Sequence, residues 1–495
     1  MTASPPIPRT AAAALFILLL GTFAYFHHPA PGWNVNSRLA LTAALVERGT
    51  VRIDGYFDTP DFETGDVAAF GGHHYSDKAI GTSLLGVPAY AVLHGFRVLA
   101  GAETPVGVRR YIVTVFSVGL CAAAAGVVLA RLAARLMRRA GAGDREAVRG
   151  GLAIAVLLAT GTQMLFYSTL FMAYMPAVLF ALLAFERFEA RRDEGGPVPW
   201  LACGVLMGLA VLCEYLFGAL AVLLALMLAL SARGAGAGAV GRGLALYAVG
   251  ALAGVAPFIG YTLAVFGTPA IPYQYHANEM FRDFMARGVM GATVPKAAVL
   301  WLITFHPYRG LFVHSPFLVA AVAGLFVMAR RPGLRAAGWF GLLAAGFYLL
   351  FNAGYYMWWG GWSFGPRHLI PMLPFLGLGL VAAWRSSAAR AAVLALAVPA
   401  VALHMVVVAV DPQFRDLNPM TPLRILLEPD LSHEYLWLFP RYIWPLFKAG
   451  DLGMNGGRLL GLQGPASLLP LAVWWLAGGA CLWVLARRST APQTG

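Results

Sequence analysis

The chain has 495 residues, of which 59% are hydrophobic and 12% are charged, and its mean hydropathy is +0.69. This composition excludes an ordinary soluble domain and predicts a single integral membrane domain over residues 1–495. The formal net charge is +13. The arginines cluster at the ends of apolar runs, which is the positive-inside pattern and argues against nucleic-acid binding.

The first predicted membrane span covers residues 11–26 and follows Arg9. It lacks a clear small-x-small cleavage site, so we expect it to be retained, with a cleaved signal peptide as the alternative. The polar segment 33–78 then lies on the non-cytoplasmic side. Residues 81–99 are apolar but contain Pro88, His94 and Arg97. A full crossing there would place the arginines of 131–149 outside, so we predict a juxtamembrane helix at the outer interface.

The remaining apolar runs alternate with arginine-bearing loops. The predicted spans are 111–130, 151–167, 172–188, two short helices within 200–230 that meet near Glu214, 244–266, 311–328, 339–352, 369–384, 391–410 and 468–485. The fold class is therefore an all-α polytopic bundle of about twelve transmembrane helices with both termini cytoplasmic. Four large loops face outward, and the first of them carries the juxtamembrane helix. They are 28–110, 267–310, 354–368 and 411–466.

Acidic and basic side chains are concentrated in the first outer loop. Its segment from Asp54 to Glu63 and Asp66 supplies several candidate general bases, and the sequence does not choose among them. Tyr75, Asp77 and Lys78 stand where this loop re-enters the apolar phase. A lysine at that depth can bind a phosphate headgroup, and Asp77 beside it would keep the lysine charged or help to hold a metal. The alternative is an interfacial lysine that snorkels to water.

A second string with distinctive chemistry is 358–368, WWGGWSFGPRH. Its glycine pair lets the backbone approach a ligand closely, and Trp359 can stack on a sugar ring. Arg367 can grip a phosphate with two parallel hydrogen bonds, and His368 follows it directly. The alternative is an aromatic belt with an anchoring arginine.

Two further charged residues mark the rims of predicted spans. Arg309, within the string 306–310, is a candidate second phosphate contact. Glu214 lies in an apolar run, where a carboxylate is costly unless it is paired or faces a wet cavity. A structural ion pair and a role in substrate binding both remain open for Glu214.

At the first outer loop the chain resembles the GT-C superfamily of polyprenyl-phosphate-dependent glycosyltransferases, and within it an uncharacterised bacterial branch similar to protein mannosyltransferases and aminoarabinose transferases. The resemblance rests on Asn36-Ser-Arg38, the helical stretch 39–48, Gly49 and Asp77-Lys78. The strings 355–371 and 306–310 are also similar to strings found in that group. The specific motifs span only some sixty residues, roughly an eighth of the chain.

The resemblance implies an inner-membrane glycosyltransferase acting on the non-cytoplasmic (periplasmic) face. Its partners would be a polyprenyl-phosphate-linked sugar, an acceptor of the cell envelope (lipid, glycan or protein) and membrane lipid. No cofactor and no metal ligands are assigned, and the resemblance leaves room for a divalent metal. The candidate catalytic residues are Asp54, Asp77 and Asn36. The candidate substrate and phosphate contacts are Arg38, Tyr75, Lys78, Arg309, Trp359, Arg367, His368 and Glu214. Among these, the resemblance implies that Lys78, Arg367 and Arg38 stabilise the phosphate leaving group.

One departure from the family pattern matters for the chemistry. Where the family has an aspartate just before the arginine, this chain has Asn34, Val35 and Asn36. An amide cannot accept a proton as a general base. Either Asp54 or another loop acid takes that role, or the arrangement differs, or the chain is a noncatalytic scaffold of an envelope complex. A transporter or flippase of lipid-linked sugars is the other alternative, and it would need polar groups along the membrane midplane.

Overall fold

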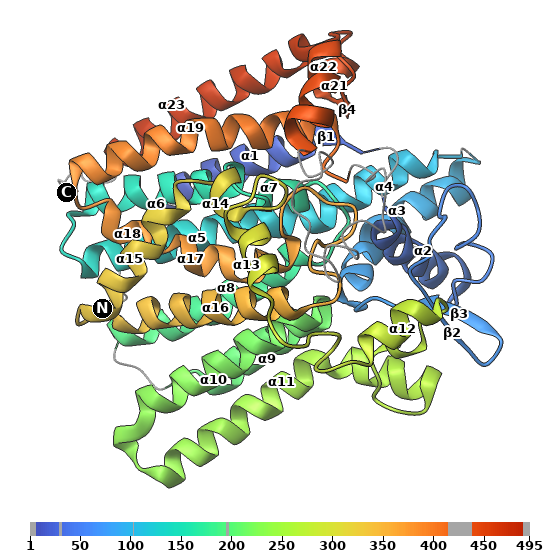
Figure 1. Cartoon of the computed structure of the whole chain (residues 1–495), viewed down its shortest axis with the longest axis horizontal. Helices are drawn as coiled ribbons and strands as arrows, with labels where there is room; N and C mark the ends of the chain where they lie inside the picture. Colours follow the sequence, from blue (N-terminus) through green and yellow to red (C-terminus); the bar gives the residue numbers. More distant parts are fainter. Residues whose placement is uncertain (1–5, 29–31, 102, 195–197, 414–437, 489–495) are drawn as a thin grey trace.

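The computed structural model describes residues 6–28, 32–101, 103–194, 198–413 and 438–488. Long helices lie side by side in a bundle, and loops, short helices and two small antiparallel sheets gather at one end of it, on the right in Figure 1. The long helices of the bundle are α1 (Arg9–Ala24), α5 (Leu120–Arg139), α6 (Asp144–Thr160), α8 (Tyr174–Glu194), α15 (Leu318–Arg330), α16 (Arg335–Gly354), α19 (Ser387–Val410) and α23 (Leu469–Arg488). The all-α membrane architecture predicted from the sequence is confirmed.

Within the described ranges, seven helices are long and apolar enough to cross a membrane. They include Val106–Arg139, in which α4 (Val106–Thr114) continues through one wider turn into α5, and also α3 (Gly81–Ala100). Shorter apolar helices such as α1 and α9 (Trp200–Cys213) accompany them. The predicted count of about twelve spans remains a prediction, as does the interfacial placement of α3.

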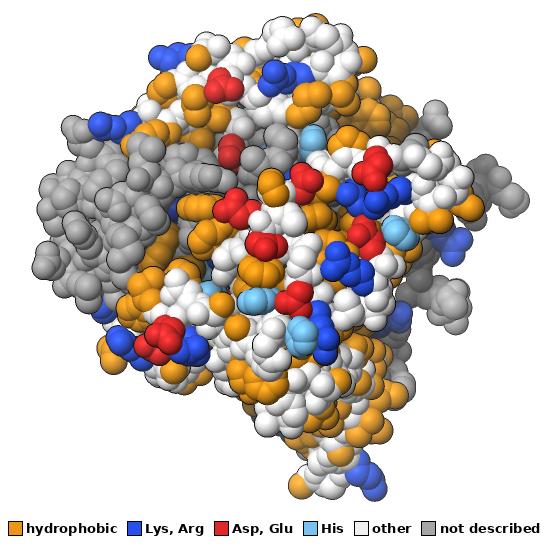
Figure 2. All heavy atoms as spheres, turned by 90° about the vertical axis from the view of Figure 1, so that its right-hand side faces the viewer, with side chains coloured by type: hydrophobic (Ala, Val, Ile, Leu, Met, Phe, Trp, Pro, Cys, Tyr) orange, Lys and Arg blue, Asp and Glu red, His pale blue; other side chains and the backbone are white. Residues whose placement is uncertain are grey.

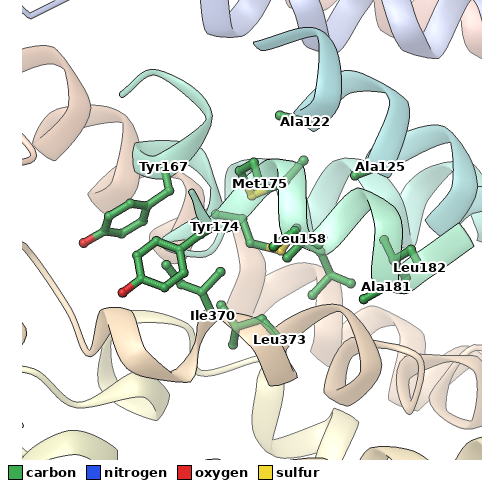
Figure 3. Close-up of a cluster of buried hydrophobic side chains, with 14 of the residues drawn as sticks. Ala122, Ala125, Leu158, Tyr167, Tyr174, Met175, Ala181, Leu182, Ile370 and Leu373 are labelled. Atoms are coloured by element: carbon green, nitrogen blue, oxygen red, sulfur yellow. The ribbon is translucent and has the colours of Figure 1, made fainter. Parts of the chain in front are cut away.

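Short helices connect or flank the long ones within the described residues. They include α7 (Met164–Ser168), α13 (Ala297–Thr304), α14 (Leu311–His314), α17 (Leu373–Gly377) and α18 (Leu380–Ala383). The core between α8 and the segment 370–373 is apolar, with Met175, Leu158 and Leu373 fully enclosed. Figure 3 shows Tyr167 and Tyr174 at one edge of this cluster, with their hydroxyl groups pointing away from the other labelled side chains. The core therefore ends in polar groups on the side where the loops gather.

A helical arm, which packs on α8 and α16 of the bundle, lies along the lower edge of Figure 1. It consists of α9, α10 (Gly218–Ala232) and α11 (Ala237–Phe266). Glycines on α9 and α11 let the two backbones touch, because a Cβ at Gly204 would lie 2.1 Å from Tyr247 O and one at Gly254 would lie 2.4 Å from Val205 O. Close approach through small residues is how helices associate in lipid. The predicted break near Glu214 is confirmed, since α9 ends at Cys213 and Glu214 has extended backbone.

The loop end is built on α2 (Trp33–Arg48), which ends at Gly49 in the left-handed conformation, φ 60°. In the part of the chain that the structure describes, the same end of the molecule also holds α3, α12 (Glu279–Met285), α21 (Trp444–Ala449), α22 (Gly456–Leu459) and four strands. Strand β2 (Val67–Phe70) pairs with β3 (His73–Ser76), and β1 (Phe26–His27) pairs with β4 (Met454–Asn455). The opposite end of the bundle is rich in arginine, where Arg138 donates to Pro6 O at 2.7 Å and Arg139 pairs with Glu189 and Asp193.

Candidate functional site

Short hydroxyl side chains of α2 hold the segment that carries Asp77 and Lys78. Ser37 Oγ lies 2.7 Å from Asp66 O and 2.8 Å from Ser76 Oγ. Thr42 Oγ1 donates to Ser83 O at 3.1 Å. These residues are buried, so their polar groups depend on one another for hydrogen bonds. Residues 77 and 78, which follow strand β3 directly, are therefore held in place against α2.

Lys78 lies between two carboxylates. Its Nζ is 2.9 Å from Asp66 Oδ2 and 2.9 Å from Asp77 Oδ2. The Asp77 side chain is fully buried, and the Lys78 side chain is 13% exposed. The Lys78 ammonium also lies 5.4 Å from the centre of the Tyr273 ring, within range of a cation–π contact. Lys78 is thus a charged group fixed by two carboxylates, and its side chain does not extend freely toward water.

The pKa values of this cluster follow from burial and from mutual attraction. Burial alone would lower the pKa of Lys78, but Asp66 and Asp77 raise it above 10.5. Burial works against ionisation of Asp66, yet Lys78 lowers its pKa below 3.8. Burial raises the pKa of Asp77 by more than Lys78 lowers it, consistent with its complete enclosure. At neutral pH the Lys78–Asp66 pair is therefore charged on both sides.

Arg367 enters the same region from the loop 354–368. Gly360 and Gly361 have φ of 79° and 68°, and a Cβ at Gly360 would lie 2.8 Å from Arg367 Cγ. The glycine pair thus makes room for the arginine side chain. In the part of the chain that the structure describes, no carboxylate lies within ion-pair distance of Arg367, and its buried Nε has no hydrogen-bond partner. Arg367 is partly buried with a guanidinium available to an anion.

Arg38 connects α2 to the break between α9 and α10. Its Nη1 donates to Ala79 O at 2.7 Å, and its Nε donates to Asn34 Oδ1 at 3.1 Å. Its Nη2 lies 3.9 Å from Glu214 Oε2. Glu214 is therefore both paired and placed at a cavity wall, which satisfies the two conditions that make a carboxylate tolerable there.

One cavity of about 410 Å³ brings these groups together. Its polar wall contains Arg38, Asp66, Asp77, Lys78, Tyr174, Glu214, Tyr273, Arg367 and His368. The rest of the lining is largely apolar and aromatic, and it includes Met280, Phe281, Phe284, Met285, Met290, Phe351, Trp33, Trp359 and Trp362. Figure 2 shows acidic, basic and histidine side chains gathered on this end of the molecule, amid hydrophobic surface. Such a mixture of apolar walls and convergent charges is typical of a ligand site.

Three side chains at the cavity edge have the spacing of a metal site. The ligand atoms of Asp66, Asp77 and His276 all lie within 4.8 Å of one another. Two observations oppose a metal in this arrangement. The Lys78 ammonium already lies between the carboxylates. His276 Nδ1 accepts from Asn278 N at 3.0 Å, which leaves the proton of a neutral ring on Nε2, the atom 3.8 Å from Asp77. A metal would have to displace Lys78 and reverse this tautomer.

The cavity collects most of the site residues predicted from the sequence, but not all of them. Those that line it are Arg38, Asp77, Lys78, Glu214, Trp359, Arg367 and His368. Asn36 does not line the cavity, and its Nδ2 donates to Glu63 O at 2.9 Å. Tyr75 is buried against Phe266. Arg309 is buried, with Nη2 3.4 Å from Gly361 O, so it lies behind the glycine pair. Their assigned roles remain predictions.

Asp54 occupies a different surface. Its Oδ2 lies 2.9 Å from His73 Nδ1 and its Oδ1 lies 2.9 Å from His74 Nδ1, and its side chain is 38% exposed. It does not line the cavity. Partial burial works to raise the pKa of Asp54, but the hydrogen bonds from His74 and His73 outweigh it and lower the pKa below 3.8. Asp54 ties the hairpin to the loop after α2, and its assignment as general base remains a prediction.

Several lining residues were not singled out from the sequence as site residues. Asp66 was counted only among the loop acids, although it is the second partner of Lys78. Tyr273 and the neighbouring His276 come from the loop 267–310, where no motif marked them. The sequence does carry a signal for Asp66, because the glycine pair 71–72 between two β-type runs predicts a hairpin that pairs residue 67 with residue 76.

Comparison with known proteins gives a structural likeness only. No family model matches the chain, and no curated protein matches it. Among solved structures, the chain is similar to the crystal structure of ArnT from Cupriavidus metallidurans bound to undecaprenyl phosphate. The two share 16% identity over 96% of this chain and 75% of that chain, with a TM-score of 0.48. A likeness at this level does not transfer the activity of that protein to this chain.

Proposed function

We propose that this chain is a membrane glycosyltransferase that moves a sugar from a polyprenyl-phosphate donor to an envelope acceptor on the non-cytoplasmic face. The proposal rests on the presence of a cationic side chain and an apolar wall in the same cavity. Arg367, a cation without a carboxylate partner among the described residues, shares the cavity with a wall of methionine and phenylalanine. A polyprenyl phosphate matches both features, because its phosphate can bind Arg367 and its isoprenoid chain can lie against the apolar wall.

The charge balance of the cavity supports an anionic ligand. Lys78 is neutralised by Asp66 and Asp77, and Arg38 is faced by Glu214, which leaves the charge of Arg367 uncompensated within hydrogen-bonding range. A guanidinium in a water-poor cleft binds phosphate in a bidentate way and gains most where the dielectric constant is low. Arg367 would hold the donor phosphate and stabilise it as the leaving group.

The lipid part of the donor would lie along the apolar wall. Met280, Phe284 and Met285 belong to α12, and Phe351 belongs to α16. Methionine and phenylalanine adapt to a flexible hydrocarbon chain without fixing one conformation. The tryptophans Trp33 and Trp362, whose ring centres are 5.5 Å apart, also line the cavity and offer flat surfaces for sugar rings.

The distribution of arginine residues indicates on which membrane face the cavity opens. The cavity lies at the loop end of the bundle, and the arginine-rich cluster of α5 and α8 lies at the other end. With that arginine-rich end in the cytoplasm, the cavity opens on the outer face of the plasma membrane. A transporter would need its polar residues distributed through the bundle, whereas the charged groups of this cavity gather at one end.

The test is sugar transfer by the purified full chain in nanodiscs, with a panel of radiolabelled polyprenyl-phosphate sugars and membrane extracts as acceptors. We expect transfer of at least one sugar by the wild type and at least a hundred-fold loss in Arg367→Gln, since the leaving-group contact is made most strongly in the transition state. Arg52→Gln, an exposed arginine of the same outer loop, is the matched control and should retain wild-type activity. Transfer by Arg367→Gln at the wild-type rate would refute the proposal.

A further inference from the structure

The remaining chemical question is which group accepts the proton of the acceptor. Asn34 and Asn36 are amides and cannot do so. Among the described residues, four ionisable groups at the cavity are candidates by type, namely Asp66, Asp77, Glu214 and His368. Hydrogen bonds and ion pairs separate the three carboxylates, and His368 is distinguished from them by the experiment below.

Asp66 and Asp77 are engaged by Lys78. Each presents an oxygen 2.9 Å from the same ammonium. A proton added to either carboxylate would weaken this ion pair and leave a buried lysine with less compensation, which costs free energy at the moment of catalysis. These two acids are therefore suited to holding Lys78 and poorly suited to cycling a proton.

Glu214 has a looser contact with its cation. Its Oε2 is 3.9 Å from Arg38 Nη2, beyond hydrogen-bonding distance, and its side chain is 16% exposed at the cavity wall. Arg38 does not rely on it, because Ala79 O and Asn34 Oδ1 already accept from the guanidinium. Arg367 and Lys78 also act on Glu214 through their charges, so the carboxylate stands in the same electrostatic field as the donor site.

The position of Glu214 is specified by the arm. The 30-residue helix α11 packs on α9 through the glycine contacts, and α9 stops at Cys213 so that Glu214 follows at the end of the helix. Arg38 spans the gap between Asn34 on one side and Glu214 on the other. The carboxylate of Glu214 thus lies beside Arg38, whose neighbours in the outer-loop sequence, Asn34 and Asn36, are amides.

We propose, on the basis of the proposed function, that Glu214 is the general base of the transfer reaction. Its carboxylate takes the proton from the acceptor hydroxyl, whose oxygen forms a bond to the anomeric carbon. The bond from that carbon to the phosphate oxygen breaks, and its electron pair leaves with the polyprenyl phosphate beside Arg367. The step is a single displacement and inverts the anomeric configuration.

The experiment measures donor binding and transfer separately in nanodiscs for Glu214→Gln, Glu214→Asp and the exposed control Glu279→Gln. Loss of a general base reduces the rate by about a hundred-fold to ten-thousand-fold. We expect that loss in Glu214→Gln, with the Kd for the donor within about three-fold of wild type, and partial activity in Glu214→Asp. The acidic limb of the pH–rate profile should be present in the wild type and absent from the residual activity of Glu214→Gln.

Chemical rescue separates a catalytic role from a structural one. In Glu214→Ala, formate should restore part of the transfer rate, because a small carboxylate can occupy the vacated space and accept the proton. Absence of rescue, or Glu214→Gln with full activity, overturns the assignment. An acidic limb lost in His368→Gln or Asp66→Asn and retained in Glu214→Gln also overturns it. If the wild type transfers no sugar from any donor, the proposed function itself fails. This outcome is distinguishable from failure of the Glu214 assignment, in which the wild type is active.

Discussion

Lys78 Nζ lies at the same distance, 2.9 Å, from Asp66 Oδ2 as from its sequence neighbour Asp77. The lysine is thereby shared between the two ends of the β2–β3 hairpin, since residue 66 precedes β2 and residue 77 follows β3. The hairpin, the ion pair and the cavity wall form one unit. Perturbing any part of it should therefore change the others.

Replacing Lys78 with methionine should destabilise the fold and alter the cavity at once. Two carboxylates would lose their common cation, and breaking a buried ion pair by removing one partner costs about 3–5 kcal/mol. We expect a lower thermal midpoint for Lys78→Met in nanodiscs, measured by intrinsic fluorescence. Lys448→Met, at an exposed lysine of α21, should leave the midpoint unchanged. An unchanged midpoint in Lys78→Met would show that the cluster contributes nothing to stability.

The same variant should acquire affinity for divalent cations. In the wild type Lys78 occupies the space between Asp66 and Asp77, and the His276 tautomer opposes a metal. Removing the ammonium leaves two carboxylates that a hard cation can satisfy. Electron paramagnetic resonance should therefore detect Mn²⁺ bound to Lys78→Met and little bound to the wild type. Tight Mn²⁺ binding by the wild type that disappears in His276→Ala would contradict this account.

The pH dependence of the cluster follows from the directions of its pKa values. Lys78 has a raised pKa, so its stabilising charge is present at lower pH and is lost only as the pH rises through a value above 10.5. Asp66 has a lowered pKa, so its contribution is present at higher pH and is lost as the pH falls through a value below 3.8. We expect the stability difference between wild type and Asp66→Asn to stay constant between about pH 5 and 9. A difference that changes steeply near neutrality would be inconsistent with these shifts.

Gly360→Ala should act through Arg367. The added Cβ would lie 2.8 Å from Arg367 Cγ, and the residue would keep a φ of 79° at a cost of about 1–3 kcal/mol. The arginine must shift, so we expect weaker donor binding by roughly ten-fold, which corresponds to 1.4 kcal/mol. Gly346→Ala, in open space within α16, is the matched control. Equal donor affinity in both variants would mean that the glycine pair does not position Arg367.

Asp54→Asn distinguishes the two candidate locations of the general base. Asp54 lies with His73 and His74 away from the cavity. We therefore expect the amide variant to keep transfer activity within about three-fold of wild type, since the residue touches no reacting group. The radiolabel transfer assay measures this directly. A loss as large as that expected for Glu214→Gln would return the role of base to the outer loop.

The sequence predicted local features of this site well because their signals are local. The helix that ends at Gly49, the break at Glu214 and the neighbouring Asp77-Lys78 pair all follow from residues close together in the chain. The Arg38–Glu214 pair and the entry of Tyr273 into the cavity depend on how the arm and the loop 267–310 dock. Docking of that kind is decided by tertiary packing, for which one sequence carries no periodic signal. For the same reason Asp54 and Asp66 were indistinguishable as loop acids until the hairpin placed them on different surfaces.

The central claim is that Arg367 and the apolar wall together bind a phosphate on a lipid chain. Native mass spectrometry or fluorescence titration of polyprenyl phosphate against the full chain in nanodiscs measures this most directly, with wild type, Arg367→Gln and Arg52→Gln compared side by side. We predict saturable binding by the wild type and Arg52→Gln, a large loss in Arg367→Gln, and no competition by inorganic phosphate alone. Equal binding by all three proteins would contradict the account.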